Sequence, residues 1–378
     1  MKMKVIVAPD SFKGSMSSTE AAASIKEGLQ AYDPDMTVKT IPMADGGEGT
    51  VDALLSILGG TRIEKEVFDP LGREITASYG WINHTKTAVV ETAAASGLPL
   101  LDTQELNPME TSTYGTGQLI ADALERGAEK IILGLGGSAT VDAGTGCFQA
   151  LGVHFLNDKG EKLDMCGDSL SSVSNIETDS MHPRMSEVEW TIASDVTNPL
   201  LGEKGAVAVF GPQKGVTQEQ LPIFEQKMTQ YASVVEDHTT KKCRHINGSG
   251  AAGGFGFTLF SLLDQPEVES GFRLIAEWSD LKGHLADADL VITGEGKMDS
   301  QSLYGKVPVG IAQMAKEAEV PCIALTGKVE GDLVAAKSEG LQVILPIVDE
   351  PMSLEEAMSR GKELCKKASH RFMEVYHM

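Results

Sequence analysis

Five loops of this sequence carry side chains that could bind phosphate groups and a divalent cation. Each loop follows an apolar run typical of a buried strand, and each combines acids or hydroxyls with glycine or lysine. The candidates are Asp10, Ser11 and Lys13 in "PDSFKGS", Asp45 and Glu48 in "PMADGGEGT", Gly136, Gly137, Ser138 and Thr140 in "LGLGGSAT", Asp195 and Asn198 in "IASDVTNPLLG", and Glu295, Lys297 and Asp299 in "GEGKMD". Glycine pairs let backbone N–H groups approach an anion, carboxylates bind Mg²⁺ through oxygen, and lysines offset phosphate charge. Together these residues indicate phosphoryl transfer with Mg-ATP.

The stretch "DLVITGEGKMDSQSLYGKV" (289–307) illustrates the pattern. It predicts a short buried strand over 289–293, a loop over 294–299 and a helix that begins near Tyr304. A capped turn would explain a single Ser or Asp after the strand, but not two acids and a lysine together. We therefore interpret 294–299 as a loop that holds metal and phosphate.

Other nucleotide-binding motifs are weaker or missing. "GLGGSA" (134–139) matches the dinucleotide pattern G-x-G-x-x-A, but the apolar run near residue 155 ends in Leu156-Asn157, without the acid expected at the end of the next strand. No P-loop is present, because Gly305-Lys306 and Gly327-Lys328 are each followed by valine. Protein-kinase and nucleophile-elbow signatures are also missing. A dehydrogenase is therefore less well supported than a kinase.

The elements that must position these loops follow an α/β pattern. Strand and helix signals alternate at both ends of the chain, whereas residues 61–91 show short alternating runs typical of antiparallel strands. A discontinuous Rossmann-like parallel-sheet domain (1–62 and 285–378), with a mixed α/β domain (63–284) inserted, explains this order. In open parallel sheets ligands bind beyond the carboxyl ends of the strands, where the candidate loops would lie.

Composition excludes several classes of partner. Lys and Arg total 32 and Asp and Glu total 54, giving a net charge of −22, so nucleic acid and anionic membranes are poor partners. The five cysteines form no CxxC pair, which favours reduced thiols over a zinc site. No signal peptide or membrane-length apolar run is visible, so we expect a cytoplasmic protein that is a monomer or homodimer.

Nine motifs, in order along the chain, resemble those of the type-1 bacterial glycerate kinases. They are "APDSFKGSMSS", "MADGGEGT", "DPLGR", "ETAAASGL", "GLGGSATVDAGTG", "SDVTNPLLGEKGA", "FGPQKG", "GSGAAGGFG" and "DLVITGEGKMDSQSLYGK". The resemblance implies transfer of phosphate from ATP, with Mg²⁺, to D-glycerate. It also implies two α/β domains with the active site in the cleft between them, and it favours 2-phosphoglycerate over 3-phosphoglycerate as the product.

We assign roles to the candidates as hypotheses. Asp195 or Asp299 would accept the hydroxyl proton, while Lys13 and Lys297 offset phosphate charge. Asp10, Ser11, Arg73 and Asn198 would bind the substrate, with the guanidinium of Arg73 on a carboxylate. The metal would be held by Asp45, Glu48 and Glu295. The nucleotide would be bound by Gly136, Gly137, Ser138, Thr140, Lys297 and Lys306. The alternatives are a kinase for another small hydroxy or sugar acid, and a regulator that binds a nucleotide or metabolite without catalysis.

Three positions depart from the family pattern. Val141-Asp142-Ala143-Gly144 stands where Asn-Asp-Gly-Gly is usual, Lys297 replaces the usual arginine, and Thr92 replaces a common methionine. None of these departures removes a carboxylate. Lysine keeps the charge of arginine but not its two parallel N–H donors.

Overall fold

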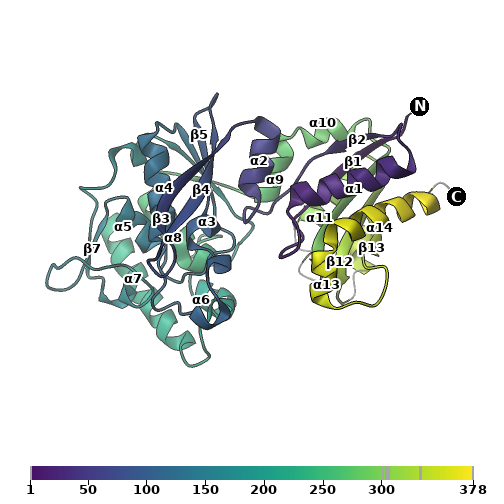
Figure 1. The fold of residues 1–378 in the computed structure, drawn as a ribbon. Helices are drawn as coiled ribbons and strands as arrows, with labels where there is room; N and C mark the ends of the chain where they lie inside the picture. Colours follow the sequence, from purple (N-terminus) through teal and green to yellow (C-terminus); the bar gives the residue numbers. More distant parts are fainter. Residues whose placement is uncertain (1, 300–301, 303–306, 332–333, 377–378) are drawn as a thin grey trace. The chain divides into compact units, whose positions relative to one another are not determined.

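The chain divides into two units, each with its own β-sheet (Figure 1). The computed structural model describes residues 2–299, 302, 307–331 and 334–376. The first unit comprises Met1–Asp45, Asp52–Gly59 and Gly271–Met378, and the second comprises Gly46–Val51 and Gly60–Ser270. The largest difference from the sequence-based division is at 270/271. Residues 271–284 belong to the first unit, where Phe272 packs so closely on Gly310 that a Cβ there would lie 2.6 Å from the ring.

The first unit is built on a parallel five-stranded sheet of order β13-β12-β11-β1-β2. Its strands are β1 (Lys4–Pro9), β2 (Thr37–Thr40), β11 (Leu290–Met298), β12 (Cys322–Val329) and β13 (Leu341–Pro346). Its helices are α1 (Ser18–Tyr32), α9 (Gly271–Trp278), α10 (Leu281–Leu285), α11 (Val307–Glu317), α12 (Val334–Ser338), α13 (Leu354–Ser359) and α14 (Gly361–Tyr376). Between β2 and β3 runs α2 (Thr50–Leu58). The predicted α/β class and parallel sheet are confirmed.

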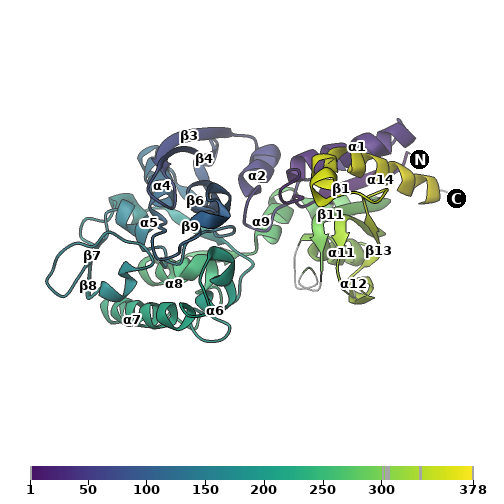
Figure 2. The ribbon, with the colours of Figure 1, turned by 60° about the horizontal axis from the view of Figure 1, so that its bottom comes forward.

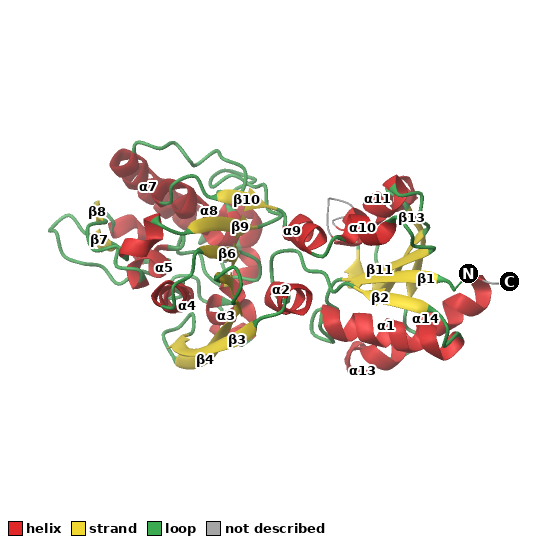
Figure 3. Cartoon of the chain, turned by 90° about the horizontal axis from the view of Figure 1, so that it is seen from above, coloured by secondary structure: helices red, strands yellow, loops and turns green. Residues whose placement is uncertain are grey.

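Helices cover both faces of this sheet. In Figure 3, α10 and α11 lie on one face and α1 and α14 on the other. Helices α1 and α14 run side by side (Figure 2). They can approach closely because Gly28 has no side chain, and a Cβ there would collide with Ser369. The predicted capping box of α1 is present, since the Ser17 side chain accepts from the Glu20 backbone N–H and the Glu20 side chain accepts in return.

The expected loop over 294–299 is wrong for most of its length. Strand β11 continues to Met298, because β12 runs beside it and pairs with it as far as Lys297 with Lys328 and Met298 with Val329. The glycines that indicated a loop serve instead to bring backbones together. A Cβ on Gly294 would lie 2.1 Å from the Leu325 carbonyl oxygen.

We expect Gly294→Ala to destabilise the protein by about 1–3 kcal/mol, because the new methyl group can be accommodated only by moving the backbone of β12. Gly296→Ala is the milder comparison, since its Cβ would lie 3.2 Å from the Phe12 Cα, a tight contact that a shift of a few tenths of an ångström relieves. Thermal unfolding of both variants measures the difference. An equal Tm for the two would show that close strand packing at Gly294 is not required.

The sequence pattern over 353–372 predicts a single helix, but the structure has two helices there, α13 and α14, separated at Arg360. Glycine at position 361 allows the break to approach the loop after β1, where a Cβ would lie 2.3 Å from the Ser15 Oγ. The break therefore lets α13 lie beside the loop that carries Lys13.

The second unit contains a mixed six-stranded sheet of order β10-β9-β6-β5-β4-β3. Its strands are β3 (Thr61–Phe68), β4 (Glu74–Ile82), β5 (Thr87–Glu91), β6 (Lys130–Gly134), β9 (Glu189–Ala193) and β10 (Glu267–Glu269), with a hairpin of β7 (His154–Leu156) and β8 (Asn175–Glu177). Its helices are α3 (Thr92–Ser96), α4 (Tyr114–Glu125), α5 (Thr145–Ala150), α6 (Ala206–Phe210), α7 (Leu221–Thr239) and α8 (Ala251–Leu262). The antiparallel pairing predicted within 61–91 is confirmed for β3–β4 and β4–β5.

The core of the second unit is formed by the sheet and its helices. Tyr231 of α7 packs edge-on against Phe257 of α8, with ring centroids 6.1 Å apart. The backbone of α8 breaks at its start, because Ala252, Gly253 and Gly254 all have positive φ angles. This break belongs to the "GSGAAGGFG" motif and directs Ala252 toward a small pocket described below.

Candidate active site

Three carboxylates of the first unit gather where β1 ends beside the middle of β11. Pro9 pairs with Gly294, and the Asp10 N–H donates to the Gly294 carbonyl at 2.8 Å, so Asp10 and Glu295 lie on neighbouring strands. The chain after β2 continues along β1, with the Met43 N–H donating to the Pro9 carbonyl at 3.0 Å, and this brings Asp45 to the same edge. The sheet order thus brings together residues that are far apart in the sequence.

These acids line a pocket of about 570 Å³. Its polar side is formed by Asp10, Ser11, Lys13, Asp45, Glu295, Lys297, Asp299 and Lys328, and its apolar side by Phe12, Ile347, Val348, Leu354, Ala357 and Met358. A pocket with a few convergent polar groups and an apolar wall is typical of small-molecule sites. The structure therefore unites all seven candidates from "PDSFKGS", "GEGKMD" and Asp45.

The field in this pocket is strongly negative at Asp10. Asp10 is only 6% exposed, and burial together with the neighbouring charge of Asp45 raises its pKa to about 8, with a smaller contribution from Glu295. The Ser11 N–H, which donates to Asp10 Oδ1 at 2.6 Å, and the charge of Lys13 act in the opposite direction. Perturbed carboxyl groups in a pocket are typical of functional sites.

Two lysines accompany the acids. The Lys13 Nζ lies 3.9 Å from Asp45 Oδ2. The Lys297 Nζ lies 3.2 Å from Asp299 Oδ2 and 3.1 Å from Glu330 Oε2, and hydrogen bonds to Glu330 and Asp299 raise the pKa of Lys297. The Lys297 amine therefore remains cationic beside its two acidic partners. Sequence reasoning did not select Glu330, which comes beside Lys297 only because β11 and β12 pair.

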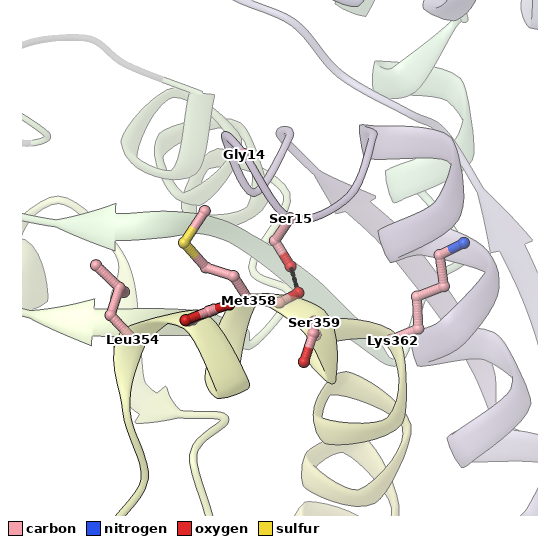
Figure 4. A pocket seen from close by; sticks show the side chains of 8 residues that line it. Gly14, Ser15, Leu354, Met358, Ser359 and Lys362 are labelled. Atoms are coloured by element: carbon pink, nitrogen blue, oxygen red, sulfur yellow. Dashed lines mark hydrogen bonds between the residues drawn. The ribbon is translucent and has the colours of Figure 1, made fainter.

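Helix α13 forms the apolar wall beside these residues. The Ser15 hydroxyl donates to the Met358 carbonyl at 2.6 Å, which ties the loop after β1 to α13 (Figure 4). Leu354 and Met358 line both the pocket described above and the shallow hollow shown in Figure 4. The hydrogen bond thus holds the Lys13 loop and the apolar wall in one arrangement.

Four further candidates belong to the second unit. Glu48 and Asp195 are exposed, and Asn198 donates from its side-chain amide to the Lys204 carbonyl at 2.8 Å. Arg73 is 47% exposed and bonds to Asp69 Oδ2 at 2.5 Å and to Glu105 Oε1 at 2.6 Å, so its guanidinium already has two acidic partners. Lys306 lies outside the described residues.

The "GLGGSAT" loop of the second unit contacts a residue that sequence reasoning passed over. Gly136, Gly137 and Ser138 line a small pocket together with Lys214, whose Nζ donates to the Ser138 Oγ at 2.7 Å and to the Thr140 carbonyl at 2.8 Å. The Thr140 side chain is fully buried. The motif "FGPQKG" was a signal for Lys214, but nothing in the sequence shows that this lysine is buried.

The comparisons with known proteins bear on the whole chain. The model of the glycerate kinase family matches residues 5–377. The chain belongs to the glycerate kinase family. It is 42% identical over 371 residues to a glycerate kinase of Halalkalibacterium halodurans, covering 98% of this chain and 97% of that one. It is 39% identical over 367 residues to the glycerate 2-kinase of Escherichia coli (97% and 96% covered).

A solved structure gives the same result. The crystal structure of a candidate glycerate kinase 2 from Salmonella typhimurium LT2 matches with a TM-score of 0.85 and 37% identity, covering 100% of this chain and 99% of that one. As a member of the glycerate kinase family the protein is a kinase, and its acid and lysine cluster has the residue types that phosphoryl transfer requires.

Two further observations concern the described part of the chain only. It contains no group of three or more His, Cys, Asp or Glu side chains arranged to hold a metal ion by themselves. It also contains no helix that is both long and apolar enough to cross a membrane.

Proposed function

We propose that this kinase transfers the γ-phosphoryl group of ATP, bound with Mg²⁺, to the 2-hydroxyl of D-glycerate. The observation that carries the proposal is the pocket of the first unit, where four carboxylates and three lysines meet beside an apolar wall. The names of the relatives, glycerate kinase and glycerate 2-kinase, support the substrate and the hydroxyl.

The residues of this pocket fit a magnesium–nucleotide complex. Burial, followed by the negative charges of Asp45 and Glu295, raises the pKa of Asp10, and a divalent cation would offset these charges. Mg²⁺ bound with ATP needs only one or two carboxylates, since phosphates and water supply its other ligands, so a preformed cage is not required. Asp45, Glu48 and Glu295 would hold it directly or through water, and the ion would neutralise charge on the phosphates.

The other residues of the chain position the reactants. Lys13 and Lys297 would bind phosphate oxygens, and the wall formed by Val348, Leu354 and Met358 suits a purine base. Asp10, Ser11, Arg73 and Asn198 would bind the hydroxy acid, and Asp195 or Asp299 would accept its proton. The nucleotide would also be contacted by Gly136, Gly137, Ser138, Thr140 and Lys306.

These residues come from both units. The proposal also includes a cytoplasmic location for the protein. For a reaction that depends on positioning and charge, misplacing the phosphates should slow turnover more than losing the base.

The test is product formation from D-glycerate and Mg-ATP. Enolase and pyruvate kinase convert 2-phosphoglycerate to pyruvate, so we expect pyruvate without phosphoglycerate mutase. Pyruvate that appears only when the mutase is added would mean that the 3-hydroxyl is phosphorylated. Without ADP release from a folded preparation, the assignment to D-glycerate fails, and a panel of other hydroxy and sugar acids comes next. L-Glycerate and reactions without acceptor are the controls.

A further inference from the structure

Lys214 is a buried lysine of the second unit that the mechanism above does not use. It ends the short 3-10 turn Pro212–Lys214 and is only 2% exposed. Its Nζ donates to the Ser138 Oγ and to the Thr140 carbonyl, at 2.7 and 2.8 Å. A lysine ammonium has three N–H donors, so these two neutral acceptors leave capacity for a third partner.

The Nζ of Lys214 borders a small pocket. The pocket has a volume of about 130 Å³ and is lined on one side by Gly136, Gly137 and Ser138, with Val196 and Phe210 among its apolar residues. Gly137 has a positive φ of 75°, which lets the loop turn beside Ser138. Four water molecules at about 30 Å³ each would fill this space. It can hold one charged group, but not a nucleoside, because such ligands need about 300 Å³ or more.

The charge balance at Lys214 favours an anion. Burial lowers the pKa of Lys214 to about 7, and the field of Asp142 only partly opposes this effect. The hydrogen bonds of the Asp142 carboxylate go to other groups than the lysine. It accepts hydrogen bonds from the N–H and hydroxyl of Thr113 and from the N–H groups of Gly144 and Gly146. The other buried titratable groups nearby, Cys147 and Tyr231, stay neutral, since burial raises the pKa of both.

We propose that Lys214, with the loop Gly136–Ser138, binds one oxyanion group of a reactant, either the carboxylate of the hydroxy acid or a phosphoryl group of the nucleotide. The inference rests on the proposed function for the identity of the reactants. An anion beside the buried ammonium would replace the solvation that the lysine has lost, so binding favours the protonated form. Binding should therefore take up protons near neutral pH.

Two measurements test the proposal. The first is the pH dependence of the two KM values of the unmodified protein between pH 6 and 9. We expect the KM of one reactant, D-glycerate or Mg-ATP, to rise up to tenfold per pH unit above about pH 7, because the lysine loses its proton. The reactant whose KM responds is the source of the anion.

The second measurement uses substitutions. Lys214→Met should raise the KM of that same reactant about 10- to 100-fold, remove its pH dependence and leave the other KM unchanged, because a charged hydrogen bond is lost. Lys214→Arg keeps the charge and should recover part of the affinity. Lys159→Met, an exposed lysine of the same unit, is the control with the same change in net charge.

Calorimetry with D-glycerate and with Mg-ADP separates this inference from the proposed function. Proton uptake, measured in buffers with different ionisation enthalpies, supports the site even where no turnover occurs. The inference is overturned by the absence of both proton uptake and a pH-dependent KM in the unmodified protein. A folded Lys214→Met variant with unchanged KM values would also overturn it. Should Lys214→Met fail to fold, the measurements on the unmodified protein decide.

Discussion

Replacing Asp10 with asparagine should remove most of the turnover and at the same time raise the melting temperature. We expect kcat to fall by at least about 10²-fold, because the carboxylate lies among Lys13, Asp45 and Glu295 in the proposed site of phosphoryl transfer. Asparagine keeps the shape of the side chain and can still accept the hydrogen bond that the Ser11 N–H donates at 2.6 Å. The loss of turnover would then reflect the lost carboxyl group and not a change in the shape of the side chain.

The gain in stability follows from the sign of the pKa shift. Asp10 has a pKa of about 8 in the folded protein, against an ordinary value of 3.8, so the folded state binds the proton more tightly than the unfolded state. The free energy of unfolding of the unmodified protein therefore falls as pH rises from about 4 to 8. An asparagine side chain at this position carries no such charge. The upper bound of the difference is roughly 5 kcal/mol at pH 8 and much less at pH 5.

Thermal unfolding at pH 5 and pH 8, without nucleotide or metal, measures this effect. The Tm of Asp10→Asn should exceed that of the unmodified protein by several degrees at pH 8 and by less at pH 5. Asp35→Asn, an exposed acid of the same unit, is the control and should change little. A variant no more stable than the unmodified protein at pH 8 would contradict the crowding of negative charge around Asp10.

Replacing Lys13 with methionine should lower kcat by about 10²- to 10³-fold with almost no change in stability. The Lys13 side chain is 69% exposed, and its Nζ is 3.9 Å from Asp45, so the ion pair contributes at most about 1 kcal/mol to folding. In the proposed reaction, however, the amine meets phosphate oxygens whose charge is redistributed in the transition state. The effect should therefore appear in kcat and not in Tm.

Steady-state kinetics with Mg-ATP and D-glycerate measures this prediction. Lys13→Arg should restore part of the rate, because it keeps the positive charge. Lys2→Met, which breaks an exposed ion pair with Asp35 in the same unit, should leave the rate unchanged. A Lys13→Met enzyme within about threefold of the normal kcat would remove Lys13 from the catalytic group.

The local elements could be predicted from the sequence because their signals are local. The apolar run at 4–8 predicted β1, the Ser17–Glu20 capping box predicted the start of α1, and the short alternating runs of 61–91 predicted antiparallel strands. These features depend on backbone propensity, capping and periodicity within a few residues. The glycines of "GEGKM" misled the prediction, because a glycine required for close strand packing has the same sequence signal as a glycine in a turn.

The sequence by itself determined the α/β class and the residue types of the site, since polar residues that follow buried strands must lie at one edge of a parallel sheet. Only the tertiary structure decided which of them meet. The pairing of β1 with β11 puts Asp10 beside Glu295, and the pairing of β11 with β12 gives Lys297 its partner Glu330. Burial and the charge of Asp45 raise the pKa of Asp10, with a smaller contribution from Glu295. The sequence also did not predict that Lys214 is buried or that Arg73 has two acidic partners. Desolvation and charge pairing depend on the tertiary neighbours of a side chain, which the local sequence does not specify.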